Sequence, residues 1–131
     1  MYTSIIQVTD SSCPWVGIDH VQLAIPVGAE PIARRFYVDV LGFVEMPKPA
    51  TMAARGGCWF AAGPVALHVG ADADFVPARK AHPALLVADL PAFIRDRQLD
   101  VHWTTEIAGS TRCHLDDPFG NRIELICANC S

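Results

Sequence analysis

Residues 115–126 read LDDPFGNRIELI and join a turn to a strand that carries an unexpected charge. The turn is predicted at 117–121, where Asp, Pro, Gly and Asn each favour a tight bend. The apolar residues on both sides predict a hairpin. On the outgoing strand, Glu124 lies between Ile123 and Leu125, and a buried carboxylate is costly unless it is paired or bound to a metal. The stretch therefore predicts a partner for Glu124.

The composition is typical of one compact domain. The chain has 131 residues, of which 51% are hydrophobic and 18% charged, enough to build a core. A net charge of -4 gives no support to nucleic-acid binding, and no apolar run is long enough for a membrane span. The first residues lack a basic leader, so we expect no signal peptide and a cytoplasmic location.

Five cysteines are too few for a disulfide scaffold, and their number is odd. Cys127 and Cys130 form a C-x-x-C at the end of the sequence, with no second pair to complete a zinc site. We interpret most of these thiols as reduced, small core residues. A redox role for the terminal pair is the lesser alternative.

The order of predicted elements repeats. In the first half, a strand over 17–26 precedes a helix that begins near Pro31 and ends at Gly42. Strands over 43–46, 58–61 and 65–69 follow, with a loop over the Pro- and Ala-rich residues before 58. The second half has a strand over 81–87, a helix capped by Asp89, and strands over 101–104, 111–115 and the end of the opening stretch.

This repetition indicates an internal duplication. The segment from His20 matches the segment from His82, 62 residues later. The residues after Gly63 match those after Gly120 with a one-residue slip, which puts Ala66 opposite Glu124. A pseudo-twofold of this kind is expected to bring the first and last strands of both halves to one central site.

Two histidines and a glutamate on different strands suggest a metal site. His20, His82 and Glu124 form a set of two imidazoles and one carboxylate, which suits Fe, Mn, Ni, Co or Zn and leaves positions for substrate. The alternative is that each histidine is an ordinary core or surface residue.

The sequence resembles the vicinal oxygen chelate superfamily, which includes glyoxalase I, extradiol dioxygenases, fosfomycin-resistance transferases and bleomycin-resistance proteins. The resemblance covers residues 17–127, and the matching stretches are 19–25, 35–43, 66–69, 82–87 and 117–125. Its patterns are FY-x-D-x-LGF and DP-x-GN-x-IEL. They are specific for the fold and poor guides to the reaction.

The resemblance implies an α+β fold in which two tandem βαβββ modules form a curled mixed sheet around a central cleft. Module one spans 17–70, a connector 71–79 and module two 80–127. Residues 1–16 are an N-terminal extension or edge strand, and 128–131 are a tail. The resemblance also implies a homodimer.

The family's metal ligands fall on His20, His82 and Glu124, with a divalent transition metal as the implied cofactor. Its fourth position, a glutamate in glyoxalase I, falls on Ala66, which cannot ligate and argues against glyoxalase I chemistry. His68 and His114 are the candidate general bases. Three further residues are candidates for substrate contact: Arg55, Trp59 and Arg112. The alternative is that each is an ordinary surface or core residue.

We therefore expect a metal-dependent enzyme that binds two neighbouring oxygens of a small substrate and stabilises an oxyanion or enolate. The alternative is a metal-free protein that sequesters a ligand, as bleomycin-resistance proteins do. A structural or interaction domain is the weakest of the three interpretations.

Overall fold

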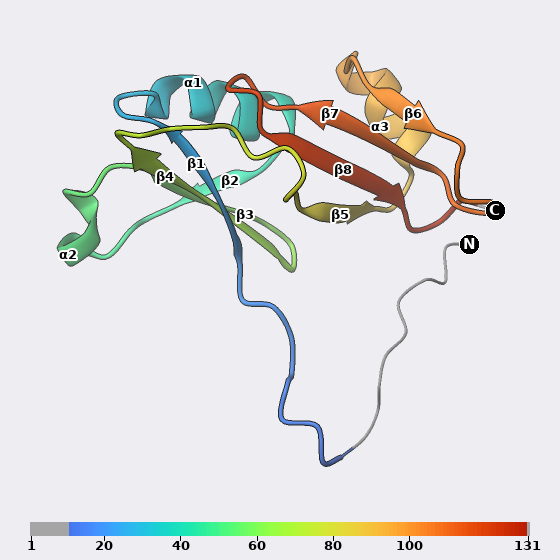
Figure 1. Cartoon of the computed structure of the whole chain (residues 1–131), viewed down its shortest axis with the longest axis horizontal. Helices are drawn as coiled ribbons and strands as arrows, with labels where there is room; N and C mark the ends of the chain where they lie inside the picture. The colour runs from blue at the N-terminus through green and yellow to red at the C-terminus, as the bar shows by residue number, and fades with distance from the viewer. Residues whose placement is uncertain (1–10, 131) are drawn as a thin grey trace.

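The computed structural model describes residues 11–130, which form two four-stranded mixed sheets (Figure 1). The strand order of the first sheet is β1 (Val21–Pro26), β4 (Val65–Asp72), β3 (Cys58–Ala62), β2 (Val44–Met46). The order of the second is β5 (Ala84–Val87), β8 (Arg122–Cys127), β7 (Arg112–Asp116), β6 (His102–Thr104). In each sheet the first strand pairs in parallel with the last, and the other pairs are antiparallel. The predicted α+β fold of two βαβββ modules is confirmed.

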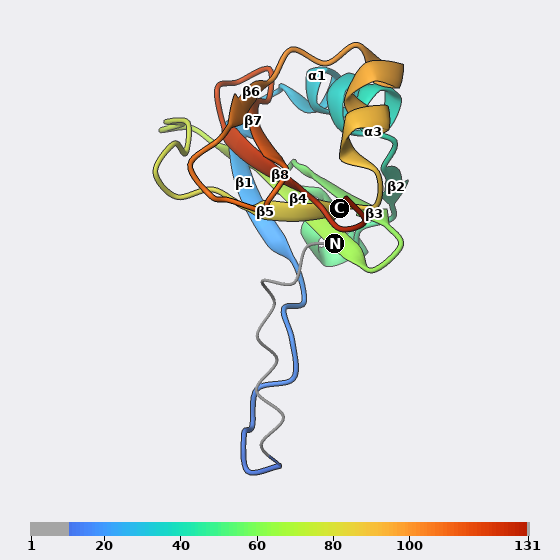
Figure 2. The same ribbon diagram turned by 90° about the vertical axis from the view of Figure 1, so that its right-hand side faces the viewer.

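Helices α1 (Glu30–Arg34) and α3 (Leu90–Arg97) lie on the same side of the molecule, at the top of the view (Figures 1 and 2). Helix α1 (Glu30–Arg34) has Pro31 in its first turn and continues into the π-helical segment η1 (Arg35–Val40). The helix ends before Gly42, whose φ of +88° suits glycine. Helix α3 (Leu90–Arg97) begins where the Asp89 carboxylate accepts the Ala92 N–H. A short helix α2 (Ala50–Ala53) lies where the sequence predicted only a loop.

Strand alternation gives each sheet a covered face and an open face. Leu67 and Val69 of β4, like Ile123 and Leu125 of β8, are buried and belong to the core beneath the helices. The alternate residues define what we call the open face. Its polar and aromatic members include Gln22, Trp59 and His68 in module one, and Arg112, His114 and Glu124 in module two.

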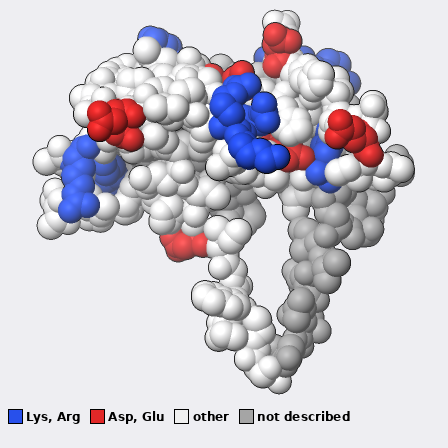
Figure 3. Space-filling view, viewed as in Figure 1, with Lys and Arg blue, Asp and Glu red and all other residues white. Residues whose placement is uncertain are grey.

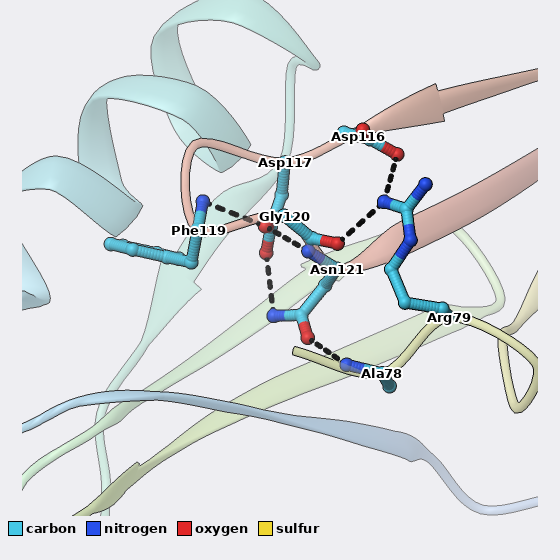
Figure 4. Close-up of polar contacts among 7 residues, drawn as sticks. All are labelled: Ala78, Arg79, Asp116, Asp117, Phe119, Gly120 and Asn121. Carbon is cyan, nitrogen blue, oxygen red and sulfur yellow. Dashed lines mark hydrogen bonds and ion pairs between the residues drawn. The ribbon is translucent and has the colours of Figure 1, made fainter. Parts of the chain in front are cut away.

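The opening stretch of the sequence joins the two modules (Figure 4). Its turn closes through a 2.8 Å bond from the Asp117 N–H to the Asn121 carbonyl, with Gly120 at φ +90°. The Tyr37 hydroxyl of η1 donates to Asp117 Oδ2 over 2.7 Å. The buried Asn121 amide donates to the carbonyl of Ala24 in β1 and accepts the N–H of Ala78. We call this set of side-chain bonds the seam.

The first and fifth strands begin later than predicted. β1 starts at Val21, and residues 11–19 run away from the sheets without forming a strand (Figure 1). Within this segment Trp15, Val16 and Ile18 are exposed. The rest of the predicted extension, 1–10, lies outside the described residues.

The strand register corrects the predicted match between the modules. In module one, His68 lies opposite Gln22 of β1 and Trp59 of β3. In module two, Glu124 lies opposite Ala84 of β5 and His114 of β7. Because Gln22 and Ala84 are 62 residues apart, as His20 and His82 are, the counterpart of Glu124 is His68. The predicted match to Ala66 is wrong, since the two hairpin loops differ in length by more than the single residue allowed for.

The terminal cysteine pair also differs from the interpretation as reduced thiols. Cys127 and Cys130 form a disulfide with a Cα–Cα distance of 5.6 Å. Cys58 and Cys113 are free and buried, as expected of small core residues.

On the face seen in Figure 3, basic and acidic side chains are interspersed between wide uncharged areas. No helix in the described range 11–130 has both the length and the apolar character needed to span a membrane.

Candidate metal centre

Three potential ligands converge on the open face of module two. One ligand atom from each of His82, His114 and Glu124 lies within 4.8 Å of the others. His114 and Glu124 are direct neighbours across the β7–β8 ladder. His82 is brought to Glu124 by the segment before β5, where the Pro83 carbonyl accepts the Glu124 N–H over 3.0 Å. Residues 42 positions apart in sequence thus share one site.

The orientation of His82 is fixed by its second ring nitrogen. Nδ1 lies 2.9 Å from the Lys80 carbonyl, which can only accept, so Nδ1 carries a hydrogen. The other ring nitrogen, Nε2, points at Glu124 Oε1 over 3.1 Å. A contact of this length requires either a proton on Nε2, which then donates to the carboxylate, or a metal ion between the two atoms. A carbonyl that holds the far nitrogen is the usual support of a metal-binding histidine.

Both oxygens of Glu124 are engaged. Oε1 faces His82 and lies 3.7 Å from His114 Nε2, while Oε2 accepts a 2.9 Å bond from Arg112. Burial of the carboxyl group raises its pKa, but the bonds from His82 and Arg112 outweigh this effect and hold the pKa below its ordinary value. Glu124 is therefore ionised near neutral pH.

These residues fit a divalent transition metal. Two imidazoles and an ionised carboxylate are the ligand types that Fe, Mn, Ni, Co and Zn accept. Arg112 donates to Oε2, while Oε1 is directed at the histidines. The Arg112 guanidinium is also an alternative counter-charge, because it stabilises buried Glu124 without an ion.

The sequence-predicted set of His20, His82 and Glu124 is not assembled within the described chain. His20 is instead part of a ring stack in module one, with its ring centroid 4.1 Å from that of His68. His68 in turn stacks on Trp59 at 4.5 Å, with the two planes 8° apart. By strand register His20, His68 and Trp59 are the counterparts of His82, Glu124 and His114.

A cavity of about 600 Å³ adjoins the cluster. It lies over β6 and β7 and is lined by His114, His102 and Arg122, among others. His114, a predicted general base, thus belongs to both the cluster and the cavity. The volume is within the roughly 300–1,000 Å³ typical of small-molecule sites.

The three residues predicted to contact substrate do not all lie at one place. Arg55 and Trp59 line a smaller cavity in module one, and Arg112 is bound to Glu124. Lys48, which lines the same cavity as Arg55, was not predicted. Lys48 lies between two prolines, in Pro47-Lys48-Pro49, and a following proline favours an extended backbone. This pattern is the signal in the sequence that could have identified Lys48.

Solved structures provide the comparison. A glyoxalase family protein from Bacillus anthracis is 42% identical, with a TM-score of 0.82, over 86% of this chain and 94% of that one. Lactoylglutathione lyase from Agrobacterium tumefaciens is 20% identical, with a TM-score of 0.63, over 88% and 96%. The antibiotic-binding protein TnmS3 from a Streptomyces species is 22% identical, with a TM-score of 0.63, over 86% and 98%.

No protein-family model matches the chain, and no curated protein matches it. The last two structures establish the fold alone. The Bacillus anthracis protein is similar enough, over nearly its whole length, to establish kinship. The chain therefore belongs to the glyoxalase family, within the vicinal oxygen chelate superfamily.

Proposed function

We propose that the protein is a metal-dependent enzyme that acts on a small oxygen-rich substrate at the open face of module two. The observation that carries this proposal is the 3.1 Å approach of His82 Nε2 to the ionised Glu124, in a cluster that also includes His114. His82 and Glu124 would hold the metal. The third ligand is His114, which the geometry favours, or His20, which the family resemblance implies.

A bound divalent metal would supply a Lewis acid that draws charge from two neighbouring substrate oxygens. Residues of the chain orient the metal ligands and hold the substrate. Arg112 fixes the Glu124 carboxylate, and the Lys80 carbonyl fixes the His82 ring. The cavity beside His114 holds the substrate.

Proton transfer requires a histidine that does not bind the metal. If His20 completes the metal set, His114 at the cavity wall is the general base. If His114 completes it, His68 is the candidate. Burial lowers the pKa of His68, and the nearby His20 and Lys48 lower it further, so that the ring is neutral near pH 7.

The test is metal content by mass spectrometry, on protein purified without chelator or nickel resin. We expect about one transition metal per chain in the wild type, lost in His82→Ala. His114→Ala and His20→Ala identify the third ligand, since only one of them should lose the metal. His102→Ala is the matched control, because this exposed histidine lies opposite His114 but outside the cluster.

A second function is favoured by the Arg112–Glu124 pair, which neutralises the buried carboxylate without an ion. In this case the protein would bind a ligand without catalysis. Absence of metal in the wild type, with no thermal stabilisation by added Mn, Fe, Co, Ni or Zn, would overturn the enzyme proposal and favour this one.

We also propose that the protein is a homodimer. Open sheets leave exposed edge strands, and β2 and β6 are such edges here. Light scattering coupled to gel filtration tests this, and a mass of one chain, 14.2 kDa, would contradict it.

A further inference from the structure

The smaller cavity of module one has the features of an anion-binding pocket. It measures about 200 Å³ and lies between the loop around α2 and the start of the open face. Two cationic residues, Lys48 and Arg55, line it together with Trp59, Met52 and Gly70. The volume is below the roughly 300 Å³ at which drug-sized ligand sites begin, so the pocket suits a ligand of about one ring.

The cationic side chains have different surroundings. The Lys48 ammonium donates to the Gly56 carbonyl, which holds it at the cavity wall. The Arg55 guanidinium is exposed and forms no side-chain hydrogen bond or ion pair with the rest of the described chain. A guanidinium of this kind is available for a carboxylate, which it can bind through two parallel bonds.

An acidic residue that interacts with Lys48 is already engaged. Glu30 accepts the Gly57 N–H over 2.8 Å, and this bond, more than any other influence, lowers the pKa of the Glu30 carboxyl. Glu30 also contributes a favourable Coulombic interaction with Lys48. The Glu30 carboxylate therefore offsets part of the Lys48 charge and leaves the charge of Arg55 uncompensated.

Glycine keeps the pocket open. A Cβ atom at Gly70 would lie 2.7 Å from the Gln22 side-chain nitrogen, and both residues line the cavity. Gly70 does not have a positive φ, so alanine is compatible with the backbone there. The absence of a side chain at this position preserves space.

The aromatic wall is held rigidly. Trp59 stacks on His68, which stacks on His20, so the indole is the end of a column of three rings. A fixed indole favours a planar aromatic partner, either offset-stacked or edge-to-face. Gln22 lines this pocket and also a second cavity that reaches His82, so the pocket adjoins the metal cluster.

We propose that the cavity between Lys48, Arg55, Trp59 and Gly70 binds a small aromatic carboxylate, with the carboxylate at the two cationic side chains and the ring against Trp59. This proposal goes beyond the proposed function. It does not require a metal and holds for either the enzyme or the ligand-binding protein.

The test is a nitrogen–proton NMR titration of the chelator-treated protein with benzoate. The signal of the Trp59 indole N–H is identified by its loss in Trp59→Leu. We expect this signal to shift saturably, while the signals of Trp15 and Trp103 stay in place. Benzamide, which lacks the charge, and acetate, which lacks the ring, should each bind about tenfold more weakly or worse.

Four variants sharpen the test. Arg55→Gln and Gly70→Ala should each weaken benzoate binding about tenfold, the first by removing charge and the second by filling space. Arg95→Gln is the matched control, since Arg95 is exposed on α3 and its loss changes the net charge equally. Equal binding of benzoate and benzamide, equal binding of benzoate and acetate, or equal effects of Arg55→Gln and Arg95→Gln would overturn the proposal. Repeating the titration with His82→Ala separates it from the metal site, because benzoate binding should persist there.

Discussion

Arg112 donates to Glu124 Oε2 over 2.9 Å, and only 12% and 11% of the two side chains are exposed. This pair supplies the partner that the buried carboxylate requires. It also places a cation and a candidate metal position on opposite oxygens of one carboxylate, because Oε1 faces His82. Arg112 and a metal ion would therefore share the task of neutralising Glu124.

Replacing Arg112 by Gln should destabilise the metal-free protein by about 3–5 kcal/mol, since it leaves a buried charge without its partner. Added metal should then raise the melting temperature more in the variant than in the wild type, because the ion replaces the missing charge. Thermal unfolding with and without Mn, Co or Zn measures both effects. Arg95→Gln, in an exposed pair, should change stability by less than about 1 kcal/mol. A smaller metal-induced shift in Arg112→Gln would contradict this account.

Acid should destabilise the metal-free protein partly through Glu124. Its pKa is lower in the folded chain than the ordinary 4.5, so its contribution to stability is present above that value and is lost as the pH falls through the folded-state pKa. Urea unfolding between pH 3 and pH 6 should therefore show a shallower pH dependence in Glu124→Gln than in the wild type. Identical slopes would show that Glu124 is not shifted.

Tyr37→Phe should destabilise the fold by about 1–3 kcal/mol, because the variant removes a 2.7 Å hydrogen bond to the buried carboxylate of Asp117, which keeps only its bonds from Phe119 and Asn121. Burial raises the Tyr37 pKa, and the neighbouring Asp117 charge raises it further. The stability that Tyr37 contributes is thus complete below the tyrosine pKa of about 10 and declines at higher pH. Chemical unfolding from pH 8 to pH 11 should show a weaker decline in the variant. The double variant with Asp117→Asn should be less destabilised than the sum of the single changes.

Native alkylation should distinguish the five cysteines. Burial raises the pKa of Cys58 and Cys113 to about 11, so both thiols should react slowly. The half-buried Cys13 should react first, and Cys130 only after reduction of the disulfide. Reduction should cost about 2 kcal/mol, because the loop that it opens is very short. Peptide mass spectrometry gives the order, and rapid labelling of Cys130 without reductant would contradict it.

The parts of the fold that the sequence predicts well are those with local causes. The turn at 117–121, the stop at Gly42 and the cap at Asp89 depend on neighbouring residues, and all three are confirmed. The register of β4 against β1 depends on pairing across the sheet, so the match of Ala66 to Glu124 failed. The Arg112–Glu124 pair is diagonal across β7 and β8, since Arg112 lies opposite Ile126. Such a partner is visible only when the register is known.

The site was partly predictable for the same reason. The in-strand charge of Glu124 indicated a partner, and His82 is beside it as expected. The joining of His114 to Glu124 and the stacking of His20 on His68 depend on the register of paired strands within each sheet, which no local pattern contains.

The side-chain bonds of the seam join the two sheets in one region, in place of a ladder of backbone hydrogen bonds between strands. Tyr37, Asp117 and Asn121 hold the modules at the centre, where bonds reach β1, η1 and the connector. The outermost strands, β2 and β6, have three residues each and lie at the far edges. Amide hydrogen exchange should therefore be slowest around Asn121 and fastest in β2 and β6, so that local opening spreads inward from the two rims while the centre stays closed.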